Sequence, residues 1–188
     1  GLRILRAVRF AAVLNFSVDS ATDRAVRDCR GLLGNIARER VRVELDKLLT
    51  GEGCVPVLRA YPEIVAEILP EIAPCFGFRQ NSRYHCYDVW EHTLAALESS
   101  VPDLAVRLTL LFHDIGKPAT YTEDARGGHF LGHAKVSAEL ARGAMERLRY
   151  DKVTEARVLE LVRIHDLPLP VGERQVKRLM MRLSEEDI

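Results

Sequence analysis

A histidine followed directly by an aspartate, His113-Asp114, lies at the end of an apolar segment. A neutral imidazole and a carboxylate are divalent-metal ligands of different softness, so the pair could bind a metal ion. It could equally be a core histidine beside a carboxylate that caps a helix. Val106, Leu110 and His113 follow helical spacing, and Gly116 ends the pattern. The sequence therefore predicts a helix that buries His113 and places Asp114 beside it.

Three further histidines lie at predicted helix ends or on inward faces. His92 lies on the apolar face of a helix, His133 begins another, and His165 precedes Asp166 at the end of a third. Independent core histidines are not expected to fall so regularly at the ends of successive helices. The joint pattern favours one metal site over four unrelated core histidines.

The elements that would position these side chains are helices. Asp88 is a suitable N-cap for the helix that carries the first of these histidines, and residues 153–164 form the helix that ends before the second His-Asp pair. Residues 121–128 are too polar to pack and predict a loop. Residues 52–87 contain four prolines and predict short helices at most. This stretch is a natural seam between two helical units.

Before the seam, the periodicity predicts three longer helices joined by short turns. They span residues 2–16, 21–33 and 35–49, and Asn35 is a candidate N-cap for the third. Short turns between helices predict close neighbours in space. We therefore expect a small helical bundle here.

Arginines recur every third residue along the first of these helices, at Arg3, Arg6 and Arg9. Such spacing forms a ridge of guanidinium groups, and guanidinium groups bind phosphates and base edges. A solvated charged face is the alternative interpretation. The ridge is a candidate RNA- or nucleotide-binding surface.

The composition excludes several classes of protein. The chain has 188 residues, 47% of them apolar, and Lys plus Arg equals Asp plus Glu at 27 each, so no overall field points to nucleic acid or membrane. The four cysteines match no zinc or redox spacing. No apolar run is long enough to span a membrane and no signal peptide begins the chain. We expect a soluble, cytoplasmic protein with no membrane partner.

These patterns together predict an all-α fold, with a small helical bundle followed by a second helical domain. The expected divisions are residues 1–60 for the bundle, 61–170 for the second domain and 171–188 for the start of a further helical segment, whose helix is predicted over 173–183.

The His-Asp pair and its surrounding histidines resemble the HD phosphohydrolase superfamily. The resemblance is closer than that, because residues 2–10 (LRILRAVRF) and 35–45 (NIARERVRVEL) are similar to the neck of the bacterial class II tRNA nucleotidyltransferases, the CCA-adding enzymes, and of related poly(A) polymerases. In that family an HD domain can follow the neck, opened by a segment like residues 87–93 (YDVWEHT). The match covers nearly the whole chain.

Three departures from the family pattern bear on activity. The catalytic head, with its glycine-rich loop and paired aspartates, would precede residue 1. Of the family's base-reading pair, Arg3 matches the arginine while the aspartate has no counterpart, and Ala37 stands where a serine is usual. We therefore expect a C-terminal fragment, neck plus HD domain, that does not polymerise on its own.

The resemblance implies roles for particular residues. A divalent ion (Ni, Co, Mn, Fe, Zn or Mg) would be held by His92, His113, Asp114 and Asp166. Catalytic roles fall to three further residues: His133 and His165 would either complete a second metal or hold the phosphate, and Lys117 could reach a phosphate as a point charge. RNA or nucleotide contacts fall to Arg3, Arg6, Arg9, Glu39 and Arg40. Of the two arrangements, a single metal ion is the one we predict.

The implied activity is that of a phosphatase or 2′,3′-cyclic phosphodiesterase on nucleotides or RNA ends. The parent would act in CCA addition or repair at the tRNA 3′ end, with the tRNA acceptor end as its partner. The competing hypothesis is a non-catalytic RNA-binding module whose HD domain serves as a structural spacer.

Overall fold

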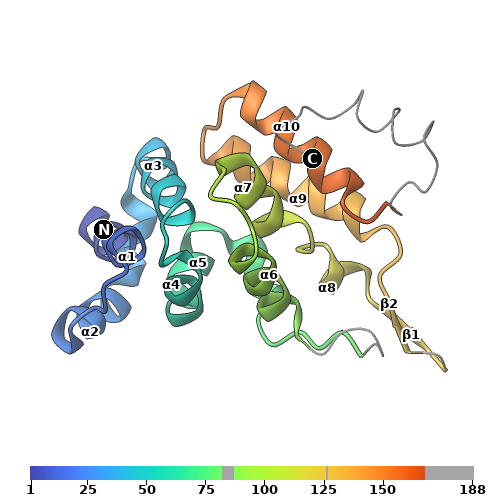
Figure 1. Ribbon diagram of the computed structural model, residues 1–188, viewed down its shortest axis with the longest axis horizontal. Coiled ribbons are helices and arrows are strands. Elements are labelled where there is room, and N and C mark those ends of the chain that lie inside the picture. Colours follow the sequence, from blue (N-terminus) through green and yellow to red (C-terminus); the bar gives the residue numbers. More distant parts are fainter. Residues whose placement is uncertain (82–86, 126, 168–188) are drawn as a thin grey trace.

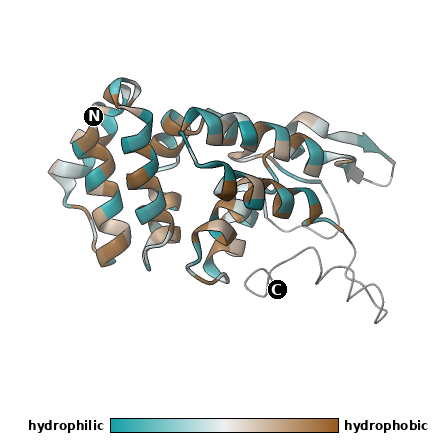
Figure 2. Ribbon diagram, turned by 90° about the horizontal axis from the view of Figure 1, so that it is seen from above, coloured by the Kyte–Doolittle hydropathy of each residue, from teal (hydrophilic) through white to brown (hydrophobic). Residues whose placement is uncertain are grey.

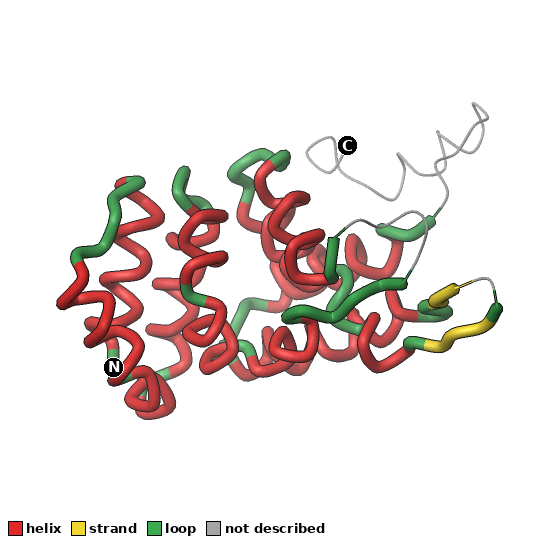
Figure 3. Tube along the Cα trace, turned by 90° about the horizontal axis from the view of Figure 1, so that it is seen from below, coloured by secondary structure: helices red, strands yellow, loops and turns green. Residues whose placement is uncertain are grey.

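The fold is helical, as predicted (Figure 1). The computed structural model describes residues 1–81, 87–125 and 127–167, so the helix predicted over 173–183 lies outside the described residues. Among the described residues the only strands are the two of a small antiparallel hairpin (Figure 3). No helix in these ranges is both long and apolar enough to cross a bilayer.

The first part of the chain is a bundle of short helices at one end of the molecule (Figure 1). Its elements are α1 (Leu2–Leu14), α2 (Ser20–Asp28), the 3-10 helix η1 (Arg30–Asn35) and α3 (Arg38–Leu49). Helix α1 packs against α3, and both contribute apolar residues to the core.

The predicted bounds of these helices need three corrections. Helix α1 ends at Leu14 because Asn15 adopts a left-handed conformation, φ 51°, which terminates helices. The second predicted helix stops at Asp28, and residues 30–35, with two glycines, form a 3-10 helix instead. Asn35 does not cap α3: the N-cap is Ala37, which offers no side-chain hydrogen bond.

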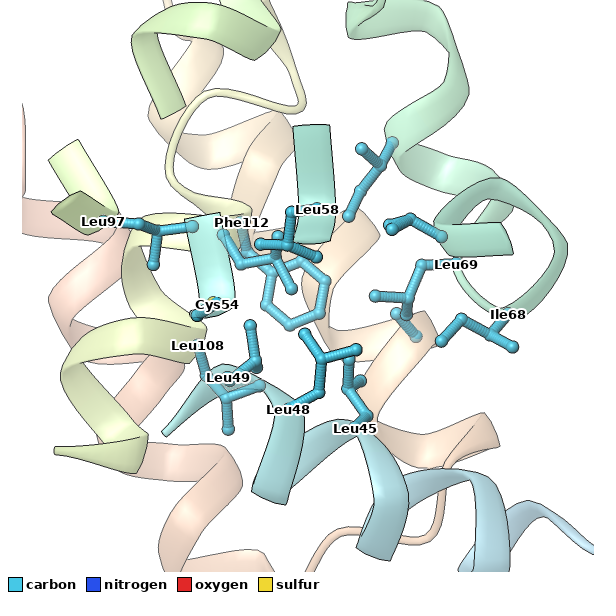
Figure 4. Close-up of a cluster of buried hydrophobic side chains, with 14 of the residues drawn as sticks. Leu45, Leu48, Leu49, Cys54, Leu58, Ile68, Leu69, Leu97, Leu108 and Phe112 are labelled. Carbon is cyan, nitrogen blue, oxygen red and sulfur yellow. The ribbon is translucent and has the colours of Figure 1, made fainter. Parts of the chain in front are cut away.

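The proline-rich stretch forms short helices, as predicted. They are α4 (Cys54–Ala60), α5 (Pro62–Ile68) and the 3-10 helix η2 (Pro70–Cys75). Figure 4 shows that their buried side chains join one cluster with those of α3, α6 and α7. Leu49, Leu58, Leu108 and Phe112 in this cluster are almost fully buried. The hydrophobic core is therefore continuous across the expected seam.

The second part of the chain surrounds the candidate site. Its elements are α6 (Val89–Glu98), α7 (Leu104–Phe112), the single turn α8 (Lys117–Thr120), β1 (Thr122–Asp124), β2 (Gly127–His129), α9 (His133–Arg147) and α10 (Lys152–Ile164). Helix α10 packs on α9 and α7, and α7 packs on α6. Figure 2 shows polar and apolar residues sharing each helix, so each helix has an apolar face for this packing.

Side-chain caps set where three of these helices begin. Asp88 accepts a hydrogen bond from the Glu91 amide at the start of α6, Asp103 caps α7 and Asp151 caps α10. The buried face of α7 differs from the predicted stripe. Leu108, Leu111 and Phe112 are buried in the core, whereas Val106 and Leu110 of the predicted stripe are only partly buried.

The segment predicted as a loop over 121–128 instead forms most of the hairpin, which ends at His129. Its strands pair Thr122 with His129 and Asp124 with Gly127. Gly127 has φ 121°, which side-chain-bearing residues rarely adopt, so a glycine is needed at this turn. The hairpin lies beside residue 81, since the Gly128 amide donates to the Asn81 carbonyl. The polar composition hid this strand pairing.

Two polar contacts tie the bundle to the second part of the chain. The buried Arg107 on α7 donates to the carbonyl of Leu49 at 2.6 Å, at the end of α3. Tyr150, between α9 and α10, donates to Asp46 of α3 at 2.5 Å. Helix α7, which ends at the His-Asp pair, is thereby fixed to the N-terminal bundle.

Candidate metal centre

The candidate site is built around one buried carboxylate, that of Asp114, which is 2% exposed. The Nε2 atoms of four histidines surround it. Those of His92 and His113 lie 3.5 and 3.2 Å from its Oδ2. Those of His133 and His165 lie 3.3 and 3.5 Å from its Oδ1. Each carboxylate oxygen therefore faces one pair of imidazoles.

Four helices deliver these five side chains to one point. His92 comes from α6, His133 is the first residue of α9, and His113 and His165 are the C-cap residues of α7 and α10. The helices lie side by side in Figure 1. Helix ends converge here because α7, α9 and α10 pack with their histidine-bearing ends together.

Three of the histidines are oriented by the backbone. The Nδ1 atoms of His113, His133 and His165 lie 2.7, 2.8 and 2.7 Å from the carbonyl oxygens three residues earlier in the chain. A carbonyl only accepts, so Nδ1 carries the proton in each case, and Nε2 of the neutral ring has its lone pair directed to the centre. This is the tautomer in which imidazole binds a metal.

The electrostatics of the centre favour bound cations. Burial acts to raise the pKa of Asp114, but the imidazoles of His113, His133 and His165 around it outweigh burial and hold that pKa far below its ordinary value. Burial acts to lower the pKa of His133, but the neighbouring Asp114 carboxylate outweighs burial and raises that pKa. The centre thus keeps a buried anion and attracts positive charge around it.

The lone pairs at the centre indicate what kind of cation fits. The Nε2 atoms of His133 and His165 lie 3.2 Å apart, and with both Nδ1 atoms protonated no proton remains between two neutral rings. Neither oxygen of Asp114 accepts a hydrogen bond of normal geometry from the described side chains. Converging nitrogen and oxygen lone pairs without protons are the donor set of a transition-metal ion.

Two groups of potential ligands share this carboxylate. In each of them the ligand atoms lie within 4.8 Å of one another. One group is His92, His113 and Asp114, and the other is Asp114, His133 and His165. The residues present therefore fit a metal centre, and Asp114 would contribute to both groups of ligands.

Asp166, predicted as the fourth ligand, is exposed and belongs to neither group. His165 takes the inward position in its place, because adjacent residues at a helix end point in different directions. The side chain of His92 is 35% exposed, whereas those of His113 and His133 are 8% exposed. The centre is therefore more open on its His92 side.

Lys117, which was predicted to reach a phosphate, also lies in the centre, beside Asp114. Its Nζ lies 2.7 Å from Asp114 Oδ2, and its side chain is only 7% exposed. The same Nζ donates to Gln80 Oε1 at 2.9 Å. Sequence reasoning missed Gln80, which is 2% exposed. Gln80 is polar and lies in a segment without helical periodicity, so nothing in the sequence indicated that its side chain is buried.

The arginine ridge of the neck is partly committed to intramolecular contacts. Arg6 and Arg9 both pair with Glu44 of α3, at 3.3 and 2.9 Å. These pairs favour a structural role for the two arginines, which was the alternative interpretation of the ridge. Arg3 and Arg40 are exposed, and within the described residues neither has an ion-pair partner.

Glu39, the remaining predicted RNA-contacting residue, is exposed in the first turn of α3. Exposed apolar side chains lie near the end of α1, at Phe10, Val13, Leu14 and Phe16. The neck therefore offers both basic and apolar groups on its surface.

A buried His-Asp pair at a helix end, ringed by histidines from neighbouring helices, defines a protein of the HD class. The comparisons agree: residues 83–187 match the HD domain model, which covers more than half of the chain, so the chain belongs to the HD domain family. Residues 15–76 match a second model, described as the probable RNA and SrmB-binding site of polymerase A.

The resemblance to tRNA nucleotidyltransferases is confirmed as well. The chain is 39% identical to the CC-adding tRNA nucleotidyltransferase of Thermus thermophilus, over 98% of the chain and 45% of the relative. It is 33% identical to the A-adding tRNA nucleotidyltransferase of Deinococcus radiodurans, over 98% of the chain and 45% of the relative. It is 34% identical to the multifunctional CCA protein of Nitrosococcus oceani, over 99% of the chain and 47% of the relative. The chain thus spans about half the length of these relatives.

Proposed function

We propose that this chain is the neck and HD domain of a tRNA nucleotidyltransferase, and that its HD centre is a metal-dependent phosphohydrolase. Its substrates would be nucleotides or the 2′,3′-cyclic phosphates of RNA ends. One observation carries the hydrolase proposal: four imidazole Nε2 atoms converge on the buried Asp114 carboxylate. A bound divalent ion supplies a water of lowered pKa, from ~15.7 toward ~7, and neutralises phosphate charge.

The residues of the centre would bind the metal ion, keep its ligands in one orientation and shield it from water. His113 and His133 are fixed by their backbone carbonyl partners, so their rings keep one orientation. Burial of Asp114 excludes competing water and strengthens its attraction for cations. The partly exposed His92 marks the side from which a phosphoester reaches the centre.

The geometry supports two metal positions better than the single one predicted from the sequence. His133 and His165 face Oδ1 of Asp114, while His92 and His113 face Oδ2. Asp114 with His92 and His113 would hold one divalent ion, and Asp114 with His133 and His165 would hold a second, the arrangement that two-metal phosphohydrolysis uses. In this arrangement His133 and His165 serve as ligands rather than as an acid, a base or phosphate donors.

The neck would bind the acceptor end of a tRNA. Support comes from the exposed Arg3 and Arg40 and from the matched RNA-binding model. Replacing Arg40 with alanine should weaken binding of an acceptor-stem RNA and lower its salt slope by about 1, the effect of one phosphate contact. Arg9→Ala is the matched control, since Arg9 is held by Glu44 and should leave that slope unchanged.

The test of the hydrolase combines metal analysis with an assay. The purified chain, loaded with Mn²⁺, Co²⁺ or Ni²⁺, is assayed on bis(p-nitrophenyl) phosphate and on 2′,3′-cyclic AMP. We expect bound metal and turnover, both reduced by His133→Ala and kept by His129→Ala. His129 is a fitting control because it pairs with Asp124 on the hairpin. RNA binding without metal or turnover would instead favour the non-catalytic module.

A further inference from the structure

Lys117 brings a cation closest to one of the two oxygens of Asp114. Its Nζ is 2.7 Å from Oδ2, the oxygen that His92 and His113 also face. The side chains whose closest contact is with Oδ1 are the imidazoles of His133 and His165. The two candidate metal positions are therefore electrostatically unequal, because a divalent ion on Oδ2 would share that oxygen with an ammonium group.

Gln80 determines where this ammonium group lies. Its Oε1 accepts the lysine's hydrogen bond at 2.9 Å, whereas the contact with Asp114 is an ion pair without good hydrogen-bond geometry. The amide of Gln80 cannot rotate freely, since its Nε2 donates to the Tyr87 carbonyl at 3.3 Å. Gln80 thus connects the chain just before α6 to the lysine beside the carboxylate.

The backbone around Gln80 is tightly fixed. A Cβ on Gly128 would come within 2.6 Å of the Gln80 carbonyl oxygen, so hairpin and segment are in close backbone contact. The Asn81 carbonyl accepts from the Gly128 amide. The Phe130 ring covers the lysine, with its centroid 5.4 Å from Nζ. An ammonium group buried this well needs an acceptor, and Gln80 supplies it.

We propose that Gln80 is a positioning residue: it holds Lys117 as a built-in counter-cation on Asp114 Oδ2 and so makes the metal position at His92 and His113 the weaker of two. This rests on the proposed metal centre. Without the Gln80 acceptor, the lysine loses its directed bond in a buried site and withdraws from the carboxylate. The weaker position then loses its competitor.

The experiment is a calorimetric titration of the metal-free chain with Mn²⁺ at fixed pH. The parent should show two steps of one ion each, a tighter and a weaker one. Gln80→Met, which keeps the length of the side chain and removes the acceptor, should tighten the weaker step by about 10-fold, the lower end of the 10–100-fold scale of outer-shell substitutions but with the opposite sign, because the competing cation is released. Lys117→Met should do the same, and the double variant should equal Lys117→Met.

Two further variants serve as controls. Gln80→Glu keeps an oxygen acceptor and should keep the weaker step weak. Asn81→Gly removes a neighbouring amide that contacts Glu123 rather than the lysine, and its φ of 39° suits glycine, so it should match the parent. An unchanged or weakened second step in Gln80→Met, or a single step in the parent, would overturn the proposal.

Unfolding in the presence of a chelator separates this inference from the proposed function. There, Gln80→Met should destabilise the parent more than it destabilises the Lys117→Met background, where only the bond from Gln80 to the Tyr87 carbonyl is lost. Additive effects would overturn the inference even if Mn²⁺ binds. Coupled effects with no Mn²⁺ binding would uphold the link between the two residues and refute the metal centre.

Discussion

Replacing Asp114 with asparagine removes the central charge while keeping the shape of the side chain. Lys117, 6% exposed, then remains as a buried cation without its anionic partner. Breaking a buried ion pair from one side costs about 3–5 kcal/mol. For a chain of this length that corresponds to a fall in Tm of roughly 6–20 °C, at about 2–4 °C per kcal/mol. Metal binding should also be lost, because both ligand groups share this carboxylate.

The assay is thermal and urea unfolding in the presence of a chelator, with metal content measured separately. The control is the double variant Asp114→Asn with Lys117→Met, which removes both charges. Replacing a whole buried pair by neutral groups is often neutral for stability, so the double variant should regain most of the loss while still binding no metal. If the free energy of unfolding of Asp114→Asn lies within about 1 kcal/mol of the parent's, the Asp114–Lys117 ion pair does not contribute the stability assigned to it.

Three further predictions concern the second ligand group and the ties to the neck. His165→Ala should lower the metal-to-protein ratio from about two toward one, whereas Asp166→Asn, an exposed change, should leave it unaltered; metal analysis of both decides which residue is the ligand. In urea unfolding, Tyr150→Phe should cost about 1.5–3 kcal/mol at pH 7 and about 0.5–1.5 kcal/mol at a pH below the folded-state pKa of Asp46, because the hydrogen bond meets a charged Asp46 only above that pKa. Burial raises the pKa of Asp46 above its ordinary value of 3.8, so the folded state holds the Asp46 proton more tightly and the contribution of Asp46 to stability falls as pH rises. An equal cost of Tyr150→Phe at both pH values would refute the hydrogen bond to a charged Asp46. Arg107→Met should cost about 1–3 kcal/mol by leaving buried carbonyls without a donor, and a change below about 0.5 kcal/mol would show that water replaces it.

The helices were predictable because their signals are local. Asp88 caps α6 as expected, and the prolines break residues 52–87 into short helices. Where the prediction was wrong, a longer-range interaction or a competing conformation decided the outcome. The hairpin in residues 121–128 depends on strand pairing and on a glycine in an unusual conformation, which helical periodicity does not register.

The candidate site was predictable in composition but not in geometry. Four histidines and Asp114 were singled out by spacing, and the structure brings all five together. The choice between His165 and Asp166 could not be made from sequence, because neighbouring residues at a helix end differ only in which way the last turn directs them. The partner of Lys117 was equally hidden, since Gln80 lies 37 residues away in a segment without periodicity.

The regular placement of the histidines has a local physical cause. His113 and His165 follow directly after a helix, where the last four carbonyls have no partner within the helix. An imidazole at this position satisfies one of them through Nδ1, and the helix end gains a hydrogen bond. The same bond leaves Nε2 unprotonated and turned away from the backbone, which is the orientation a metal ligand requires. A histidine that ends an apolar helix is thus prepared as a ligand before any metal binds, so several such ends converging on one carboxylate indicate a metal centre more strongly than the histidine count does.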